Sequence, residues 1–522
     1  MPRGLHLVLW AMALAMAAGM AAFNLVYGDL NQDEGWYLYA ARLVADGHMP
    51  YRDFAFTQGP MLPLVYGALS PLWSGFGVAG GRVLTVLLGL LTALGGAVLA
   101  ARLAPTPAGK RVAAFAAFCL IALNMYQSYF SAVVKTYSLC GLFLVLGFLA
   151  LSRASGPRGA VAAVFAAVCL AAAAATRLSA VLTLPLALAF LWLARRGSAG
   201  RAWIWFMGGG LLAGALVFLP FYLSAPDGFR FGLFEYHTGR SAGGVLKGLV
   251  LKVGFCSRVA QAYFPALVLW AGALLAARLL RTGADAEALV PVRPALWGSV
   301  LAMTLVHVVT PFPYDDYQVP VYPLFAAAVA AYAVRLAGSA GSLDWMRGLV
   351  FAGTAVFVLA SPLNQEWFVQ GRDRIWWRMK DQPPLIKLRA TAAEVRRLAP
   401  EGGELLTQDT YLAVEAGMTV PRGLELGPFS YFPAYTDEQA RARRVVNEGM
   451  MRELLSHSPA PVAAFSGYGL AIRAPDVVEL KAAEQAELWS IVNERYTPAG
   501  EIPYFGQAST TLRLFTRKRQ AE

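Results

Sequence analysis

Long apolar segments recur through the first 363 residues and constrain the fold more than any other feature of this chain. Near the N-terminus, Arg3 precedes an apolar run of more than twenty residues, long enough to cross about 30 Å of hydrocarbon. Ten further segments, each bounded by charge, proline or glycine, lie at about 83–103, 112–127, 136–152, 160–176, 179–194, 202–223, 261–280, 295–311, 318–336 and 348–363. The sequence therefore predicts an α-helical polytopic membrane protein with about eleven transmembrane helices.

The N-terminal segment has an alternative interpretation as a signal peptide cleaved near Gly19–Ala22. We favour a membrane span because the apolar run is longer than the usual 7–15-residue signal core and because apolar segments continue far downstream.

Charged residues are scarce and unevenly distributed. They make up 15% of the chain, against about 25% in an ordinary soluble domain, which excludes a soluble enzyme. Residues 1–363 hold 24 Lys and Arg and 12 Asp and Glu, whereas residues 364–522 hold 20 of each. Because the basic residues occur singly or in pairs between apolar segments, they are typical of membrane loops, and no nucleic-acid partner is expected.

The charge distribution also predicts the orientation. With the N-terminus inside, the inner loops contain only three acids, Asp285, Glu287 and Asp344. The same loops contain fourteen basic residues: Arg3, Arg102, Lys110, Arg111, Arg153, Arg158, Arg195, Arg196, Arg201, Arg278, Arg281, Arg293, Arg335 and Arg347. The outer loops hold ten basic residues and nine acids. The positive-inside rule thus predicts a protein of the cytoplasmic membrane, with its N-terminus in the cytoplasm and residues 364–522 outside it.

The outer acids gather in three short loops. Five lie in the first loop (Asp29, Asp33, Glu34, Asp46 and Asp53), two in the loop after the seventh segment, and two in PFPYDDYQVP. Ion-coupled transporters usually carry ionisable groups near the membrane midplane, and no predicted span has an acid at its centre. Any chemistry is therefore expected at the outer membrane surface.

The first outer loop contains a predicted surface helix. Trp36, Tyr37, Tyr39 and Leu43 recur at helical spacing, which is typical of a helix lying in the membrane interface, and residues 59–74 could form a second such helix. Asp33 stands just before the first helix. This position suits either an N-cap or a functional carboxylate, and the two roles do not exclude each other.

This order of features resembles the GT-C superfamily of membrane glycosyltransferases. The features are an Asp-Glu pair after the first span, a surface helix, the G-x-x-P-Y-R-D-F pattern and a proline-rich apolar helix. The chain is most similar to the family 39-like branch that contains protein O-mannosyltransferases, the lipid A aminoarabinose transferase and rhizobial galacturonosyltransferases. The resemblance covers about residues 5–363, with its specific motifs in 29–67 and 311–325.

The resemblance implies transfer of a sugar from a polyprenyl-phosphate donor, with inversion, to a lipid, glycan or protein acceptor at the outer face. Asp33 matches the family's first-loop aspartate and is the expected general base. Glu34 matches its acidic neighbour, which could orient the acceptor or hold the base. The departing lipid phosphate then needs cationic stabilisation and no strong general acid.

Ten further residues are candidates for substrate binding. Arg177 matches a basic position near the lipid phosphate, with snorkelling to headgroups as the alternative. Lys135 stands where several relatives carry an acid, which puts a two-aspartate mechanism in doubt. Gln58 lies in a segment that departs from the relatives' lysine-proline motif. The remaining candidates are Arg42, His237, Arg240, Tyr314, Asp315, Asp316 and Tyr317.

Several other features have simpler interpretations. Asp315 and Asp316 could bind a divalent cation, but the resemblance favours hydrogen bonding to a sugar or acceptor, so no cofactor or metal is expected. His307 is interpreted as a core or interfacial histidine. The glycines of GGGLLAGA (208–215) are expected to allow close helix packing and not to bind nucleotide. The four cysteines, Cys119, Cys140, Cys169 and Cys256, are interpreted as packing residues.

Residues 364–522 differ in composition from residues 1–363 and predict a small α/β domain. LIKLRATAAEVRRL has helical periodicity, and GELLTQ, PVAAFSG and TLRLFTR resemble strands. This domain could bind the acceptor or cover the active-site cavity. A transporter or flippase of lipid-linked sugars, and a noncatalytic scaffold, remain the competing classes.

The orientation can be tested with a reporter enzyme that is active only outside the cytoplasm. Fused after Glu522, it should be active because eleven spans place the C-terminus outside. Activity of a matched cytoplasm-only reporter at the same site would contradict the predicted topology.

Overall fold

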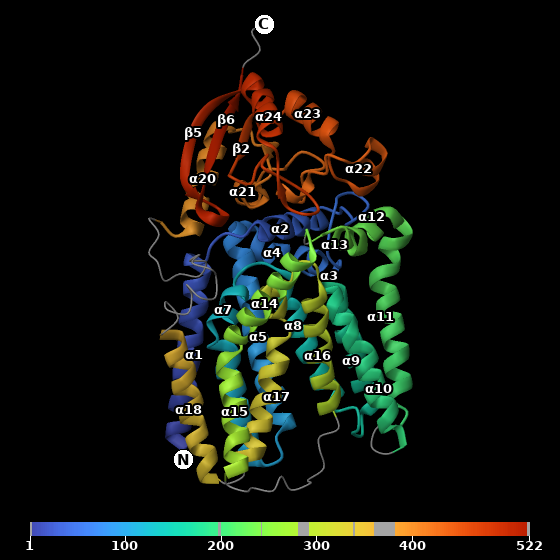
Figure 1. The fold of residues 1–522 in the computed structure, drawn as a ribbon, viewed down its shortest axis with the longest axis vertical. Helices are drawn as coiled ribbons and strands as arrows, with labels where there is room; N and C mark the ends of the chain where they lie inside the picture. Colours follow the sequence, from blue (N-terminus) through green and yellow to red (C-terminus); the bar gives the residue numbers. More distant parts are fainter. Residues whose placement is uncertain are drawn as a thin grey trace.

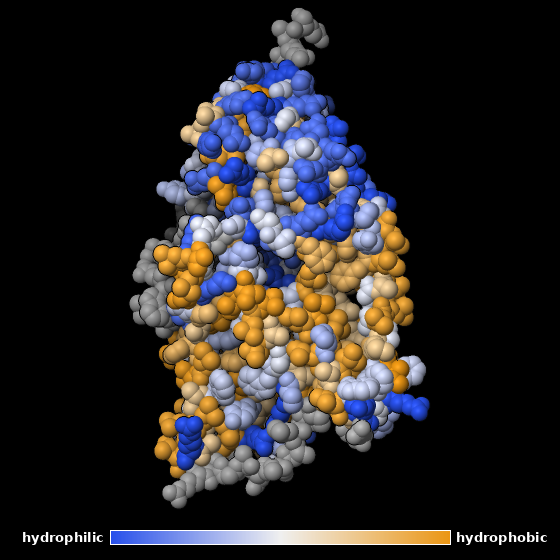
Figure 2. Space-filling view, turned by 45° about the vertical axis from the view of Figure 1, so that its right-hand side comes forward, coloured by the Kyte–Doolittle hydropathy of each residue, from blue (hydrophilic) through white to orange (hydrophobic). Residues whose placement is uncertain are grey.

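The chain folds into a bundle of long helices with an α/β domain at one end. The computed structural model describes residues 3–196, 200–241, 243–279, 292–337, 340–359 and 382–518. The N-terminal end of α1 (Arg3–Tyr27) and the α/β domain lie at opposite ends of the bundle (Figure 1). On the face shown in Figure 2, exposed apolar side chains form a broad band over the bundle, and mostly hydrophilic residues cover the α/β domain. Such a band is typical of a surface that faces lipid.

Each of the eleven predicted apolar segments contains a helix. Besides α1, these are α5 (Gly77–Leu103), α6 (Pro107–Ala122), α8 (Thr136–Leu151), α9 (Gly159–Thr176), α10 (Thr183–Leu193), α11 (Ala202–Ser224), α15 (Phe264–Leu279), α16 (Arg293–Val309), α17 (Tyr322–Ala337) and α18 (Ala340–Leu359). Within the described residues, four helices are long and apolar enough to cross a membrane, or five if a bent pair counts as one span. The protein is therefore a multi-pass membrane protein, and the number eleven stays a prediction.

The bent pair contains a helix that the sequence analysis missed. α14 (Val245–Ala262) meets α15 at an angle of 72°. Lys247, Lys252 and Arg258 interrupt its apolar pattern, so the segment did not qualify as a span. Cys256, which lies on this helix, is exposed and is not a packing residue, in contrast to the buried Cys119, Cys140 and Cys169.

The glycine-rich segment 208–215 lies inside α11. A Cβ atom on Gly209 would lie 3.3 Å from the Cα of Val164 on α9, so this glycine allows the two helices to approach closely. This contact agrees with the expected packing role.

Four short helices cap the bundle on the side of the α/β domain. They are α2 (Gln32–Ala45), α3 (Met61–Ala68), α4 (Ser70–Trp73) and α7 (Met125–Phe130). The expected surface helix of the first outer loop is α2, but its apolar residues are covered by protein and do not face lipid. Residues from Trp36 to Ala41 are all buried, because α3 packs on one side of α2 and α21 (Thr410–Ala416) of the α/β domain on another.

Two further outer segments complete this end of the bundle. After α11 the chain forms α12 (Pro226–Arg230), one π-helical turn at Phe231–Glu235, and α13 (Tyr236–Thr238). A 3₁₀ turn at Asp315–Gln318 follows α16. Both segments lie at the same end as α2 (Figure 1).

The C-terminal domain is built on a mixed four-stranded sheet of order β1-β2-β6-β5. Its strands are β1 (Leu405–Thr407), β2 (Val462–Phe465), β5 (Tyr496–Phe505) and β6 (Thr510–Arg517), and only β1 and β2 are parallel. A two-stranded ribbon, β3 (Ile472–Arg473) and β4 (Val478–Glu479), lies apart. The helices are α20 (Pro384–Leu398), α21, α22 (Asp437–Arg443), α23 (Glu448–His457) and α24 (Ala482–Arg495).

The sequence anticipated α20, β1, β2 and β6 but missed β5. β5 is an edge strand that contains Pro498 and Pro503, which weaken a strand pattern. The predicted domain boundary between residues 363 and 364 lies outside the described residues.

Close packing between α2 and the α/β domain generates a prediction. A Cβ atom on Gly35 would lie 2.5 Å from the backbone nitrogen of Tyr411 and 2.6 Å from Oγ1 of Thr410. Gly35→Ala should therefore destabilise the protein by about 1–3 kcal/mol, as overpacking does. We expect a lower midpoint of thermal unfolding for the purified variant. Gly208→Ala, where a Cβ atom meets nothing within 4 Å, is the control. Equal midpoints would contradict the packing.

Candidate active site

The N-terminus of α2 is fixed by a capping box. Asn31 is the N-cap: its side chain accepts a hydrogen bond from Asp33 N at 3.0 Å, and its own backbone N–H donates to Glu34 Oε1 at 2.9 Å. Asn31 therefore does the capping that was considered for Asp33. The side chain of Asp33 keeps 32% of its surface exposed, so its carboxylate is accessible.

Glu34 lies beneath the helix end and is fully buried against Arg82 of α5. Arg82 Nε donates to Glu34 Oε2 at 2.9 Å, and Nη2 donates to Oε1 at 2.6 Å. The remaining N–H groups of Arg82 donate to the carbonyls of Leu25, Gly28 and Asp29. Both Glu34 oxygens are thus engaged by protein, so Glu34 anchors the end of α2 that carries Asp33, which agrees with the expected alternative that it helps to hold the base.

Lys135 bridges two carboxylates from distant parts of the chain. Its Nζ lies 2.9 Å from Asp33 Oδ2 and 2.9 Å from Asp316 Oδ2. Burial alone would lower the pKa of Lys135, but Asp316 and Asp33 outweigh it and raise the pKa well above its ordinary value. Burial would raise the pKa of Asp316, but Lys135 holds it below its ordinary value. Lys135 and Asp316 are therefore both charged at neutral pH.

Arg177 lies beside this cluster and has no carboxylate partner among the described residues. Its guanidinium stands over the rings of Tyr317 and Tyr137, at 4.2 and 5.1 Å from their centroids. Only 9% of the residue is exposed, and its buried Nε has no hydrogen-bond partner within the part of the chain that the structure describes. Oδ1 of Asp316 is likewise buried and has no partner within 3.5 Å there, although the hydroxyl of Tyr137 lies near enough to help lower the pKa of this carboxyl. Buried polar atoms normally find partners, so these two are poised for a ligand.

His237 and Arg240 connect outer segments to one another. His237 Nε2 is 2.8 Å from the carbonyl of Thr57, to which the neutral ring donates, and burial lowers its pKa to about 4. Arg240 Nε donates to the carbonyl of Pro475 in the α/β domain at 3.2 Å, and its guanidinium stacks on Tyr236. Both side chains thus tie the loop after α11 to neighbouring segments, and Arg240 lies close enough to Tyr314 and Tyr317 to interact with them electrostatically. Their role in substrate binding stays a prediction.

The remaining candidates also include some that lie at the charged cluster and some that bind elsewhere. Tyr314 is 46% exposed and lies edge-on to Tyr317, at the rim of the cluster. Gln58 is half-buried, and its carbonyl accepts a hydrogen bond from the hydroxyl of Tyr51. Arg42 donates to the carbonyls of Ala413 and Met418 and so fastens the α/β domain to α2; its expected role in substrate binding stays a prediction. The side chain of Asp315 lies outside the described part of the chain.

Sequence analysis missed three residues around this site. Arg82 and Tyr137 were not singled out: Arg82 directly precedes the apolar segment 83–103, and Tyr137 is the second residue of the segment 136–152. The Asn31-x-x-Glu34 spacing is a capping-box signature that could have been recognised. His307, interpreted as a core residue, has both ring nitrogens engaged, by Ser179 Oγ at 3.0 Å and Gln318 Nε2 at 2.9 Å.

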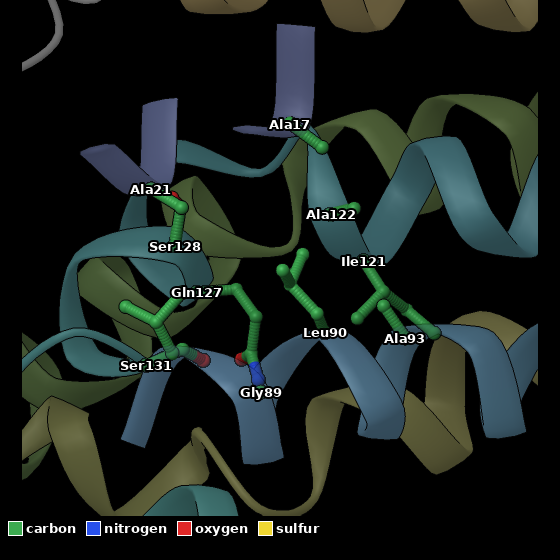
Figure 3. Close-up of a pocket in the computed structure, with 11 residues that line it drawn as sticks. Ala17, Ala21, Gly89, Leu90, Ala93, Ile121, Ala122, Gln127, Ser128 and Ser131 are labelled. Carbon is green, nitrogen blue, oxygen red and sulfur yellow. The ribbon is translucent and has the colours of Figure 1, made fainter. Parts of the chain in front are cut away.

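The membrane part also holds a small cavity of about 30 Å³ between α1, α5, α6 and α7 (Figure 3). The side chain of Gln127 reaches toward Gly89 across it, and Gln127 Oε1 has no partner among the described residues. The volume suits one or two water molecules and is far below the several hundred Å³ of a sugar site. Among the described residues, no group of three His, Cys, Asp or Glu side chains could hold a metal ion.

This helical bundle, with its short helices beneath an α/β domain, is the fold of the GT-C membrane glycosyltransferases. The structure is similar to ArnT from Cupriavidus metallidurans bound to undecaprenyl phosphate, with a TM-score of 0.57, 14% identity and 98% of each chain covered. It is also similar to the apo state of that protein, with a TM-score of 0.58, 15% identity and the same coverage.

An archaeal enzyme has a related fold. The apo oligosaccharyltransferase of Archaeoglobus fulgidus matches with a TM-score of 0.53 and 12% identity, over 99% of this chain and 75% of that one. No family model matches this chain, and no curated protein matches it. The fold expected from the sequence resemblance is confirmed, whereas function must be argued from the site.

The buried Glu34–Arg82 pair predicts a strong effect on stability. Glu34→Ala leaves the Arg82 charge buried without its partner and should destabilise the protein by about 3–5 kcal/mol. The exposed Arg397–Glu394 pair is the control, where Glu394→Ala should leave the midpoint of unfolding nearly unchanged because solvent screens the pair. Thermal unfolding of the purified variants measures both. Equal effects would contradict the positioning role of Glu34.

Proposed function

We propose that this protein transfers a sugar from a polyprenyl-phosphate donor to a hydroxyl acceptor at the outer face of the cytoplasmic membrane, with inversion at the anomeric carbon. The observation that carries the proposal is the juxtaposition of an accessible carboxylate, Asp33, with two buried cations, Lys135 and Arg177, where the apolar bundle meets the polar domain. The solved ArnT structure with undecaprenyl phosphate bound supports the donor class.

Asp33 acts as the general base in this proposal. As the acceptor oxygen attacks the anomeric carbon, its proton passes to Asp33, and the bond from that carbon to the phosphate oxygen breaks. Trp36 Nε1 lies 3.3 Å from Asp33 Oδ1 and helps to orient the carboxylate. The capping box and the buried Glu34–Arg82 pair hold the helix end that carries it.

The cations receive the leaving group. Arg177 has a buried unpartnered N–H and stands between two tyrosine rings, so it can stabilise the phosphate as its negative charge grows. Without a donor, the ammonium group of Lys135 forms ion pairs with both Asp33 and Asp316. A phosphate beside Lys135 competes for the same ammonium and loosens its hold on Asp33, which frees the base when the donor is present.

The sugar and the acceptor can be identified in cells. Mass spectrometry of surface glycans and lipids, from cells with and without the protein, should reveal one sugar substituent that is lost in its absence. A flippase would instead change the sidedness of a lipid-linked sugar without any glycosidic bond being formed by the purified protein. Transport without transfer would therefore contradict the proposal.

The role of Asp33 predicts a large loss of activity. Asp33→Asn should leave the protein folded and inserted in the membrane but reduce transfer by about 10²-fold or more, the scale of general-base catalysis. Asp46→Asn, on the exposed C-cap of the same helix, should keep normal activity. Transfer rates of the purified variants with a lipid-linked donor measure the difference. Full activity of Asp33→Asn would refute the assignment.

The role of Arg177 predicts a selective effect on the donor. Arg177→Ala should raise the KM for the lipid-linked donor at least about tenfold and leave the KM for the acceptor unchanged, because its charge serves the phosphate. Arg230→Ala removes an exposed outer arginine that pairs with Asp227 and is the control. Equal changes in both KM values would indicate a general structural role.

A further inference from the structure

A large cavity lies at the far end of α2 from Asp33, between the first outer loop and the α/β domain. Its volume is about 850 Å³, within the range of sites that bind small organic ligands. One wall is formed by α2 and residues 47–54, and the other by residues 419–425 and by α22 and α23. No residue of the Asp33, Lys135, Asp316 and Arg177 cluster lines it, so it is distinct from the candidate active site.

Hydrogen bonds across and within the walls hold the cavity in shape. Arg444 Nε donates to the carbonyl of Arg52 at 2.7 Å and joins the two walls. Asp53 closes the loop on itself, because its carboxylate accepts from Met49 N at 2.7 Å and pairs with Arg52. Val420 N donates to the hydroxyl of Tyr39 on α2 at 2.9 Å. A preformed cavity of this kind loses little entropy when it binds a ligand.

The charges in the lining favour an anion. Four arginines line the cavity, and all are exposed: Arg52, Arg422, Arg441 and Arg444. Of these, Arg422 has no carboxylate within 4 Å among the described residues, and Arg441 has only a long, exposed contact with Asp437. The guanidinium group presents paired N–H donors that match a carboxylate or a phosphate.

The acids in the lining are mostly engaged already. Asp53 is bound by Arg52, and Glu404 accepts from Ser458 Oγ at 3.3 Å. Glu425 is buried and accepts from Gly423 N at 2.8 Å, and burial raises its pKa to about 7 despite Arg422 and Arg444 nearby. Glu453 is the exposed acid that remains. Arg422 and Arg444 are therefore the lining cations that have no carboxylate within 4 Å among the described residues, and they are the groups free to receive an anion.

The rest of the lining suits a carbohydrate. Thr419 and the carboxyl groups can exchange hydrogen bonds with hydroxyls, and Leu43, Met450 and Leu454 offer apolar contacts to the C–H faces of sugar rings. We propose that this cavity binds a saccharide that carries carboxylate or phosphate groups. The assignment of that saccharide as part of the acceptor rests on the proposed function.

The distance from the base limits how such an acceptor is built. Tyr39 and Leu43 follow Asp33 by six and ten residues on α2, which corresponds to about 9–15 Å along the helix axis. A single sugar in the cavity cannot reach Asp33 over that distance. The acceptor is therefore an anionic chain of several sugars, held in the cavity while a hydroxyl further along the chain reaches the base.

Binding to the purified full-length protein, measured by calorimetry without a donor, tests the inference. The probes are trigalacturonate, mannose 6-phosphate, the neutral maltotriose and an acidic heptapeptide. Trigalacturonate or mannose 6-phosphate should bind at least tenfold more tightly than maltotriose, and the stronger of the two identifies the anionic group. Neutral and anionic saccharides binding equally, no saccharide binding, or binding of the peptide alone would overturn the inference.

A pair of variants locates the binding in the cavity. Arg422→Gln/Arg441→Gln should weaken binding of the anionic saccharide at least tenfold. Arg397→Gln/Arg473→Gln, which removes two exposed arginines outside the lining, should leave it unchanged. Equal affinities of the two double variants would overturn the inference. Asp33→Asn should bind the saccharide normally, so a failure of binding is distinguishable from a failure of transfer.

Discussion

The buried ion pair between Glu34 and Arg82 is the interaction on which the arrangement of the outer end depends. Arg82 directs all its N–H groups to Glu34 and to carbonyls near the end of α1, and so joins α1, α2 and α5 at one point. A charge buried this deeply is tolerated only because it is fully paired and hydrogen-bonded. Asp33, one residue away, takes its place from this anchor.

From that anchor, α2 acts as the boundary between the membrane bundle and the α/β domain. Its first turn carries Asp33 toward the charged cluster and packs under α21 through Gly35, and its C-terminal half lines the large cavity. Gln32 extends the contact, because its side chain donates to Asp409 Oδ1 at 3.0 Å. The α/β domain thus helps to fix the helix that carries the candidate base.

The sequence predicted features that depend on local pattern. The length of the apolar segments was sufficient to predict the helices of the bundle. The helical periodicity of apolar residues predicted α20, and short strand-like runs predicted β1, β2 and β6. The sequence did not predict contacts between residues that are far apart along the chain. Arg82 lies 48 residues from Glu34, and the segment that packs over α2 contains residues near 411. The apolar face of α2 was therefore assigned to lipid, although protein covers it.

Contacts between distant residues also decide which of the predicted candidates form the site. Asp33, Lys135, Arg177 and Asp316 were chosen one by one from four separate loops, and the structure brings them together. Arg42, His237 and Arg240 have the same residue types but bind backbone carbonyls. The residue types and the predicted outer location are the same in both sets, so the sequence could not tell them apart. Which partner each side chain meets depends on how the outer loops fold over one another.

In the proposed reaction, a lipid-linked phosphate and not a soluble nucleotide delivers the sugar. Purified protein should therefore be offered a polyprenyl-phosphate sugar or the nucleotide form of the same sugar, each with a common acceptor. The account predicts that product forms from the lipid-linked donor and that the nucleotide sugar gives none. Transfer from the nucleotide sugar alone would contradict it.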